Sequence, residues 1–349
     1  MSLFLPDRRW LLTLGSLTTV SMAVWALGWV LVASPWFYSL FEEPLGPEPG
    51  FRTAAAISRA GSTNTSVCLL LGSSTTREGF DDVMMSTSTG LEFVNGGASG
   101  GTLLWVELAL LMTQRAAVKP YCLVLGLNAR MLRPAQSDLH QRGYAPFVDI
   151  RDSVAVLDGA PEEWKGVHRG YLWKRTVWPF SAPATILGRR LERALLQRGR
   201  PEDFLWPRHL TAPPRFLYNE ANSLSVEQWK ETWWKMEREG QLDPLAYGAQ
   251  TERLRLSRIL KLAAKISPRV VVVVMPTHSR LRQQLASMQQ PFEETLEHAR
   301  RADIIDAVWG YGDALNDTHF RDFGHLNSGG RHWLSRKVAS GVKELWYRP

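Results

Sequence analysis

Short apolar runs recur along the chain and alternate with stretches in which the apolar residues follow helical spacing. Runs without polar positions are typical of parallel strands that are buried on both faces. Helical spacing is found over Leu103–Ala117 and Glu252–Lys265, between such runs. This alternation predicts an α/β fold with a parallel sheet and crossover helices. The predicted strands are Val67–Leu71, Leu91–Val94, Tyr121–Leu125, Val270–Met275 and Ile304–Val308.

Two more helices complete this part of the prediction. A helix with a break near Pro291 is expected before the fifth strand, because proline cannot donate a backbone hydrogen bond. A final helix is expected to end at about Trp346.

The N-terminal part of the chain has a different pattern. Positions 10–37 carry no charged residue, Arg8 and Arg9 precede them, and Glu42 and Glu43 follow them. A charge-free stretch of this length can cross a bilayer as a helix, and the arginines favour a cytoplasmic N-terminus. We therefore predict a cytoplasmic segment at 1–9, an uncleaved transmembrane anchor at 10–37 in the plasma (inner) membrane, and a domain outside the cytoplasm. A buried core helix is the alternative.

The rest of the chain divides by composition. Residues 38–66 are rich in Pro, Gly and small residues, which predicts a linker. The folded domain is expected over 67–349, with an insertion at about 132–248 over the mouth of the sheet. Helices are expected within this insertion at Ala184–Gln197 and Val226–Glu239. The second carries three tryptophans whose spacing favours packing over a sugar-binding platform: Trp229, Trp233 and Trp234.

Composition sets limits on partners and cofactors. The net charge is +7, but no dense run of Lys or Arg and no nucleic-acid-binding motif is found, which argues against nucleic acid as a partner. Cys68 and Cys122 begin predicted strands, so buried free thiols are expected, with a disulfide as the alternative. Zinc-ligand spacing, a phosphate loop and a dinucleotide-binding glycine pattern do not occur, so we predict neither a metal nor a cofactor.

Polar or glycine-rich blocks follow the predicted strands. The carboxyl ends of parallel strands lie on one edge of a sheet, where α/β proteins bind their ligands. The fourth block comes after the last predicted strand. The blocks are Gly72-Ser73-Ser74, Ser99-Gly100-Gly101-Thr102, Gly126-Leu127-Asn128 and Asp322-Phe323-Gly324-His325.

Together these blocks hold the groups that acyl transfer requires. A serine hydroxyl needs a base to become a nucleophile, and His325 is the candidate base for Ser74. Asp322 lies three residues before His325, so the two side chains would share a face of one helical turn and the carboxylate would orient the imidazole. The developing oxyanion would be bound by the backbone N–H groups of Ser74 and Gly100 and by the side-chain amide of Asn128.

Each assignment has an alternative. Taken alone, Ser74 would be explained as a helix cap, and so would Asn128. Asp322 and His325 would be explained as a pair of interacting side chains on the surface. Rivals of Gly100 are Gly96, Gly97 and Gly101, and rivals of the acid and base are Asp317 and His319. His278 follows a predicted strand end and is a candidate pocket residue.

The four blocks resemble those of the SGNH, or GDSL-like, hydrolase superfamily, named for Ser, Gly, Asn and His. The resemblance covers about Val67–Asn128 and Arg269–Trp346, and it implies a flavodoxin-like three-layer α/β/α domain. It also implies that Ser74 is the nucleophile, Gly100 and Asn128 are oxyanion donors, and Asp322 and His325 complete the triad. Ser73 stands where the GDSL form has Asp, and Ala129 stands where many members have Asp.

The Gly-Ser-Ser form with an N-terminal anchor is similar to D-alanyl transfer proteins of teichoic acid modification and to alginate O-acetylation proteins. That similarity implies a membrane-anchored serine esterase or O-acyltransferase acting on acylated cell-surface polysaccharide, with a multi-pass membrane acyltransferase as partner. Two alternatives stay open. The chain could be a non-catalytic accessory protein of a polysaccharide-modifying assembly, or an esterase directed at lipids.

Overall fold

The computed structural model describes most of the chain. They are residues 8–33, 49–62, 66–98, 100–132, 148–158, 165–166, 169–170, 172–173, 225–238, 242 and 250–346.

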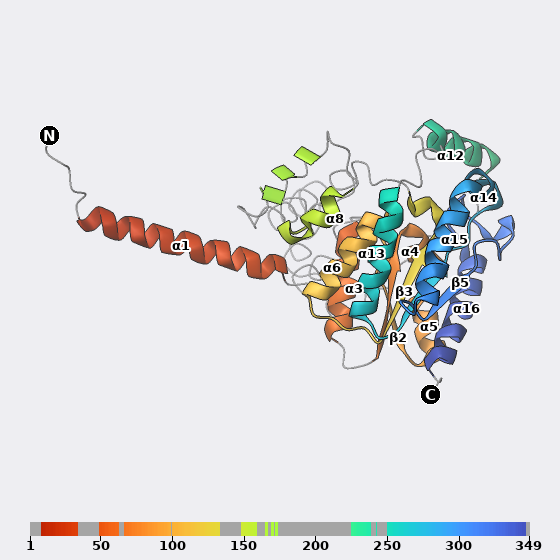
Figure 1. Cartoon of the computed structure of the whole chain (residues 1–349), viewed down its shortest axis with the longest axis horizontal. Helices are drawn as coiled ribbons and strands as arrows, with labels where there is room; N and C mark the ends of the chain where they lie inside the picture. The colour runs from red at the N-terminus through yellow and green to blue at the C-terminus, as the bar shows by residue number, and fades with distance from the viewer. Residues whose placement is uncertain are drawn as a thin grey trace, which may run out of the picture.

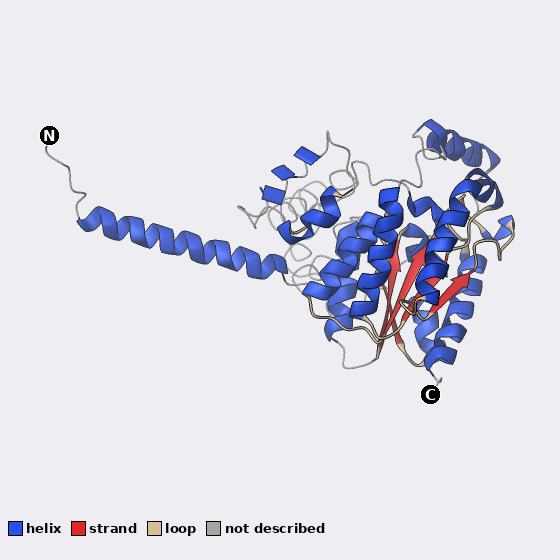
Figure 2. Cartoon of the chain, viewed as in Figure 1, coloured by secondary structure: helices blue, strands red, loops and turns tan. Residues whose placement is uncertain are grey.

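A five-stranded parallel sheet forms the centre of the fold (Figure 2). The strand order is β2-β1-β3-β4-β5, the order of flavodoxin-type doubly wound sheets. In this order the chain reverses direction across the sheet between β1 and β3, and ligands bind at such a switch point. The strands are β1 (Val67–Gly72), β2 (Glu92–Asn95), β3 (Cys122–Leu127), β4 (Val270–Val274) and β5 (Ala307–Gly310).

Helices cover both faces of this sheet, so the domain has three layers (Figure 1). One face packs against α3 (Pro49–Ser62), α6 (Leu103–Arg115), α13 (Gln250–Ile266) and α15 (Ala286–Arg301). The other face packs against α5 (Asp82–Thr89) and α16 (Ser328–Trp346). The prediction of an α/β fold with a parallel sheet and three layers is confirmed.

Short helices and turns lie at the strand ends and in the connections. They are α4 (Ser74–Gly79), α8 (Ser153–Leu157), α12 (Val226–Arg238) and α14 (Ser279–Gln284), with 3₁₀ turns at Ala129–Leu132, Ile150–Asp152 and Asp317–His319. Helix α12 confirms the expected helix at 226–239 to within one residue. The helix expected at 184–197 lies outside the described residues.

The predicted linker is wrong over 49–62, because this segment forms α3. Ala54, Ala55, Ala56 and Ile57 are buried in its middle, and the helix packs on β1, β2 and α6. Its small residues allow the helix to lie close to the sheet. The composition that suggested a linker therefore reflects tight helix packing.

Two boundaries near the C-terminus also differ from the prediction. The helix breaks at Leu285, between α14 and α15, whereas Pro291 lies inside α15. Burial of Phe292 and Leu296 holds the helix together around the missing backbone donor. Strand β5 begins at Ala307 rather than Ile304, because the backbone N–H of Ile304 donates to Ala299 O (2.9 Å) and closes the end of α15.

The N-terminal helix α1 spans Arg8–Ala33, and several of its large apolar side chains are exposed, among them Leu17, Val20 and Met22. Within the described ranges, no helix has both the length and the apolarity that a membrane crossing requires. The predicted span of 10–37 continues through positions 34–37, which are not described.

Cys68 and Cys122 are register partners on β1 and β3, and both are buried free thiols, as expected.

Strands β1 and β3 approach closely at their carboxyl ends, where Gly72 and Gly126 are register partners. Thr76, on the first helix after β1, donates its hydroxyl proton to the carbonyl of Gly126 (2.9 Å). A Cβ on either glycine would overlap the Thr76 hydroxyl. The missing side chains thus allow α4 to sit directly on the sheet edge.

This packing makes Gly126 intolerant of a side chain. We expect Gly126→Ala to lower the free energy of unfolding by about 1–3 kcal/mol, because the added methyl displaces Thr76 and presses on Met275 Sδ at 3.1 Å. Urea unfolding followed by circular dichroism measures the change. Gly310→Ala in β5 is the control: an added Cβ meets nothing within 4 Å there. Equal effects of the two substitutions would contradict the proposed packing constraint.

Candidate active site

Ser74 stands at the edge of the sheet because β1 ends at Gly72 and α4 begins at once. Ser73 is the N-cap of α4, and its hydroxyl accepts a hydrogen bond from the backbone N–H of Thr75 (3.3 Å). Ser74 is therefore the first residue of the helix, not its cap. Its backbone N–H is one of those that a helix start leaves without an intrahelical acceptor.

His325 and Asp322 reach Ser74 from a segment about 250 positions away in the sequence. His325 Nε2 lies 2.8 Å from Ser74 Oγ, and His325 Nδ1 lies 2.8 Å from both carboxylate oxygens of Asp322. The imidazole thus connects the hydroxyl and the carboxylate in one chain of hydrogen bonds. This is the arrangement in which histidine removes a serine proton while a carboxylate orients the ring.

The expectation that Asp322 and His325 share a helical turn is wrong. Both lie in the bend before α16, which begins at Ser328. Asp322 Oδ1 accepts hydrogen bonds from the backbone N–H groups of Gly324 and His325, each at 2.9 Å. Aspartate favours turns closed by its own side chain, and here that turn brings the carboxylate to the imidazole.

The surroundings of Asp322 keep it ionised. Burial by itself would raise the pKa of this carboxyl. The hydrogen bond and charge of His325, the N–H of Gly324 and the guanidinium of Arg321 outweigh burial and hold the pKa well below its ordinary value. An ionised carboxylate stabilises the imidazolium that forms when the serine loses its proton.

The loop after β2 lies against the start of α4. Ala98 N donates to Gly72 O (3.0 Å), and a Cβ on Gly101 would lie 3.0 Å from Ser73 Cα. Gly100 has φ +65°, a left-handed conformation that glycine adopts without strain. The structure therefore brings Gly100 into the loop beside the nucleophile.

The other three candidate glycines donate their backbone N–H groups to acceptors within this region. Gly96 N donates to Leu70 O (2.9 Å), Gly97 N to Asn95 Oδ1 (3.0 Å) and Gly101 N to Ala98 O (3.2 Å). The backbone N–H groups of Gly96, Gly97 and Gly101 thus each have an acceptor within the protein.

Asn128 comes to the same edge by strand register. Gly72 and Gly126 face each other, and Ser74 and Asn128 each follow two positions later. Asn128 is buried, and within the described part of the chain its Oδ1 has no hydrogen-bond partner. It lines a pocket with Thr75, the neighbour of Ser74.

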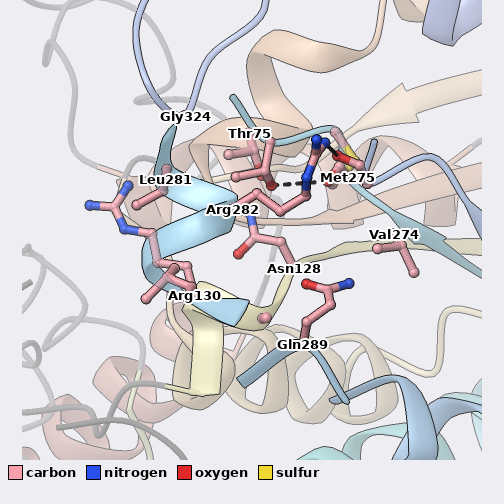
Figure 3. A pocket seen from close by; sticks show the side chains of 13 residues that line it. Thr75, Asn128, Arg130, Val274, Met275, Leu281, Arg282, Gln289 and Gly324 are labelled. Atoms are coloured by element: carbon pink, nitrogen blue, oxygen red, sulfur yellow. Dashed lines mark hydrogen bonds between the residues drawn. The ribbon is translucent and has the colours of Figure 1, made fainter. Parts of the chain in front are cut away.

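Figure 3 shows Thr75, Asn128 and Gln289 around this pocket with two arginines, Arg130 and Arg282. The apolar part of the lining is Ala129, Val274, Met275, Leu281 and Leu285. Neither arginine was expected from the sequence. Arg130 follows the end of β3 closely, and this position was its one signal, whereas Arg282 lies on α14 and had none.

The remaining candidates lie elsewhere. His278 is not among the residues that line this pocket; its ring packs on Trp229 and Phe323, and its Nε2 lies 3.5 Å from Asp317 Oδ2. His319 Nδ1 lies 2.7 Å from Asn316 Oδ1. Neither Asp317 nor His319 joins the chain of hydrogen bonds from Ser74.

The predicted packing role of the α12 tryptophans holds for two of them. Trp229 and Trp233 contact Phe323 edge-on, with ring centroids 4.4 and 4.9 Å apart, whereas Trp234 is exposed. Phe323 lies between Asp322 and Gly324, so α12 packs directly on the bend that carries Asp322 and His325.

No group of three or more His, Cys, Asp or Glu side chains is placed to hold a metal ion among the described residues. A comparison with models of known protein families, and with curated protein sequences, finds no match to the chain.

The lowered pKa of Asp322 predicts a pH-dependent contribution to stability. A carboxyl whose pKa is lower in the folded state stabilises the fold above its unfolded pKa of about 3.9, and this contribution is lost progressively as the pH falls from that value through the folded pKa. Asp322→Asn should therefore lower the free energy of unfolding by about 2 kcal/mol at about pH 7 and by less at about pH 3, where the unfolded carboxyl is already mostly protonated.

Urea unfolding at both pH values measures this difference. Asp313→Asn, at an exposed aspartate beyond β5, is the control and should change the free energy by less than about 0.5 kcal/mol. A deficit of the Asp322 variant that is the same at both pH values would rule out the charge as its cause.

Proposed function

We propose that this protein is a serine esterase or O-acyltransferase of the SGNH type that works through an acyl-enzyme on Ser74. The observation that carries the proposal is the continuous chain of hydrogen bonds from Ser74 through His325 to Asp322, at the switch point of a doubly wound sheet. Its placement beside Gly100, Asn128 and an open pocket supports the same reading.

In the first step, Ser74 Oγ attacks the ester carbonyl carbon while its proton passes to His325 Nε2. The carbonyl oxygen becomes an oxyanion, for which the N–H groups of Ser74 and Gly100 and the amide of Asn128 would be donors. When the tetrahedral intermediate collapses, the ester C–O bond breaks and the leaving alcohol takes the proton from His325. The acyl group is then bound to Ser74.

In the second step an acceptor hydroxyl gives its proton to His325 and attacks the acyl-serine. Collapse returns the proton to Ser74 Oγ and releases the acylated acceptor. Water as acceptor makes the protein an esterase, and a sugar hydroxyl makes it a transferase. The narrow pocket with an apolar wall next to Thr75 suits a short acyl group.

Further parts of the proposal rest on the sequence alone. Acylated cell-surface polysaccharide as substrate, a multi-pass membrane acyltransferase as partner and a domain outside the cytoplasm follow from the resemblance and from the charge-free run at 10–37. An accessory binding role and lipid ester hydrolysis are outcomes that the experiments below separate from this proposal.

An activated serine should react with a fluorophosphonate probe. We expect the purified full chain to gain one adduct by intact mass, and Ser74→Ala and His325→Ala to gain none, because the first lacks the nucleophile and the second its base.

Ser279→Ala provides a matched control. Ser279 also has an aspartate and a histidine nearby, since its hydroxyl donates to Asp317 (2.6 Å) and it follows His278, but it lies outside the chain of hydrogen bonds from Ser74. This variant should be labelled like the unmodified protein. A folded protein that gains no adduct would favour the accessory role, and release of fatty acid from phospholipid would favour the lipid esterase.

Membrane attachment is tested separately. The full chain should remain in the membrane pellet after alkaline carbonate extraction, and a variant lacking residues 1–46 should become extractable. This truncation removes the charge-free run but keeps α3, which begins at Pro49 and is part of the packed domain. A full chain that is extracted by carbonate would contradict the anchor.

A further inference from the structure

A buried carboxylate that the proposed reaction does not use lies one helical turn after the nucleophile. Glu78 is on α4, four positions after Ser74, and its side chain is only 9% exposed. Its Oε1 pairs with the guanidinium of Arg77, and its Oε2 lies 2.6 Å from Arg321 Nη2. A buried carboxylate is costly unless such partners compensate for its lost hydration.

Arg321 connects this carboxylate to the catalytic bend. The same Nη2 lies 3.5 Å from Asp322 Oδ2, and the backbone N–H of Arg321 donates to His325 O (2.8 Å). Its side chain is 14% exposed. One guanidinium thus lies between a carboxylate on the helix of the nucleophile and the carboxylate of the triad.

The charges in this cluster act on one another. Burial raises the pKa of Glu78, but the charge of His325 and the guanidinium groups of Arg77 and Arg321 together lower it below its ordinary value. By Coulomb's law the Glu78 carboxylate attracts, and the Arg321 guanidinium repels, a positive charge on a neighbouring group. The Arg321 charge also favours the ionised form of Asp322.

We infer that Glu78 and Arg321 are positioning residues of the acyl transfer. Their ion pair holds α4, which carries Ser74, against the bend that carries Asp322 and His325, and their opposite charges act in opposite directions on the positive charge that forms on His325 during the reaction. This inference rests on the proposed function. The other reading is an ion pair that only stabilises the fold.

The two readings differ in a pH effect: a positioning role predicts shifts of opposite sign in two variants, and an ion pair that only stabilises the fold predicts none. Loss of the Glu78 charge in Glu78→Gln destabilises the imidazolium, so His325 remains a free base to lower pH. Loss of the Arg321 charge in Arg321→Gln has the opposite effect. We expect the acidic limb of the kcat/KM profile to move down by about half to one pH unit in the first variant and up by a similar amount in the second.

The full chain is assayed with 4-nitrophenyl acetate between about pH 5 and about pH 9, with kcat and KM determined separately. Glu78→Asp keeps the negative charge, so the acidic limb of its kcat/KM profile should lie close to that of the unmodified protein. Because variants of a buried pair can lose activity, the titration of the His325 imidazole is also followed by NMR, with His325→Ala to assign the signal. In this NMR titration we expect a downward shift in Glu78→Gln and an upward shift in Arg321→Gln.

Glu92→Gln is the matched control. Glu92 forms a half-buried ion pair with Arg59 at 2.8 Å between β2 and α3, and none of the triad residues takes part in it. This substitution should leave the acidic limb and the His325 titration in place. Shifts in one direction for both test variants, or lower activity with no shift, would overturn the inference while leaving the proposed function intact. Failure of the function itself would show as no fluorophosphonate adduct on the unmodified protein.

Discussion

The close approach of β1 and β3 at their carboxyl ends is the constraint on which the site depends. Gly72 and Gly126 face each other in register, and the space left by their missing side chains is filled by Thr76. Helix α4 therefore starts immediately above the sheet, and its first residue is Ser74. The same register sets Asn128 at the edge beside it. Backbone geometry thus places Asn128 and Ser74, the proposed oxyanion donor and nucleophile, beside each other.

Asp322 and His325 are held in a different way. They lie in a bend outside the regular elements, so local hydrogen bonds have to replace a helix or strand as support. Asp322 closes the bend through two backbone N–H groups, and Phe320 and Leu326 on either side form an isolated antiparallel bridge. Phe323 packs against the tryptophans of α12. Ser74 is thus held by α4 at the end of β1, whereas the position of His325 depends on a bend against which α12 packs.

Several charged side chains are buried together near Ser74 and His325. Asp322, Glu78 and Arg321 all have little exposure, and unpaired charges would be strongly unfavourable there. Each is paired, so the cluster tolerates burial and keeps a strong local field. Such fields change the basicity of an imidazole far more than surface charges do, because water screens the latter. This arrangement explains why several ion pairs gather around one small group of residues.

The sequence by itself determined the strands, most of the helices and the residues that carry the proposed chemistry. Apolar runs and glycine-rich strand ends are local signals, and parallel strands must align their carboxyl ends. The sequence did not show that 49–62 is a packed helix, that Asp322 and His325 lie in a bend, or that Glu78 faces Arg321. Small residues are typical of both linkers and tight helix packing, and contacts between residues more than 200 positions apart leave no local pattern. Only the tertiary structure, through burial and register, decided between these possibilities.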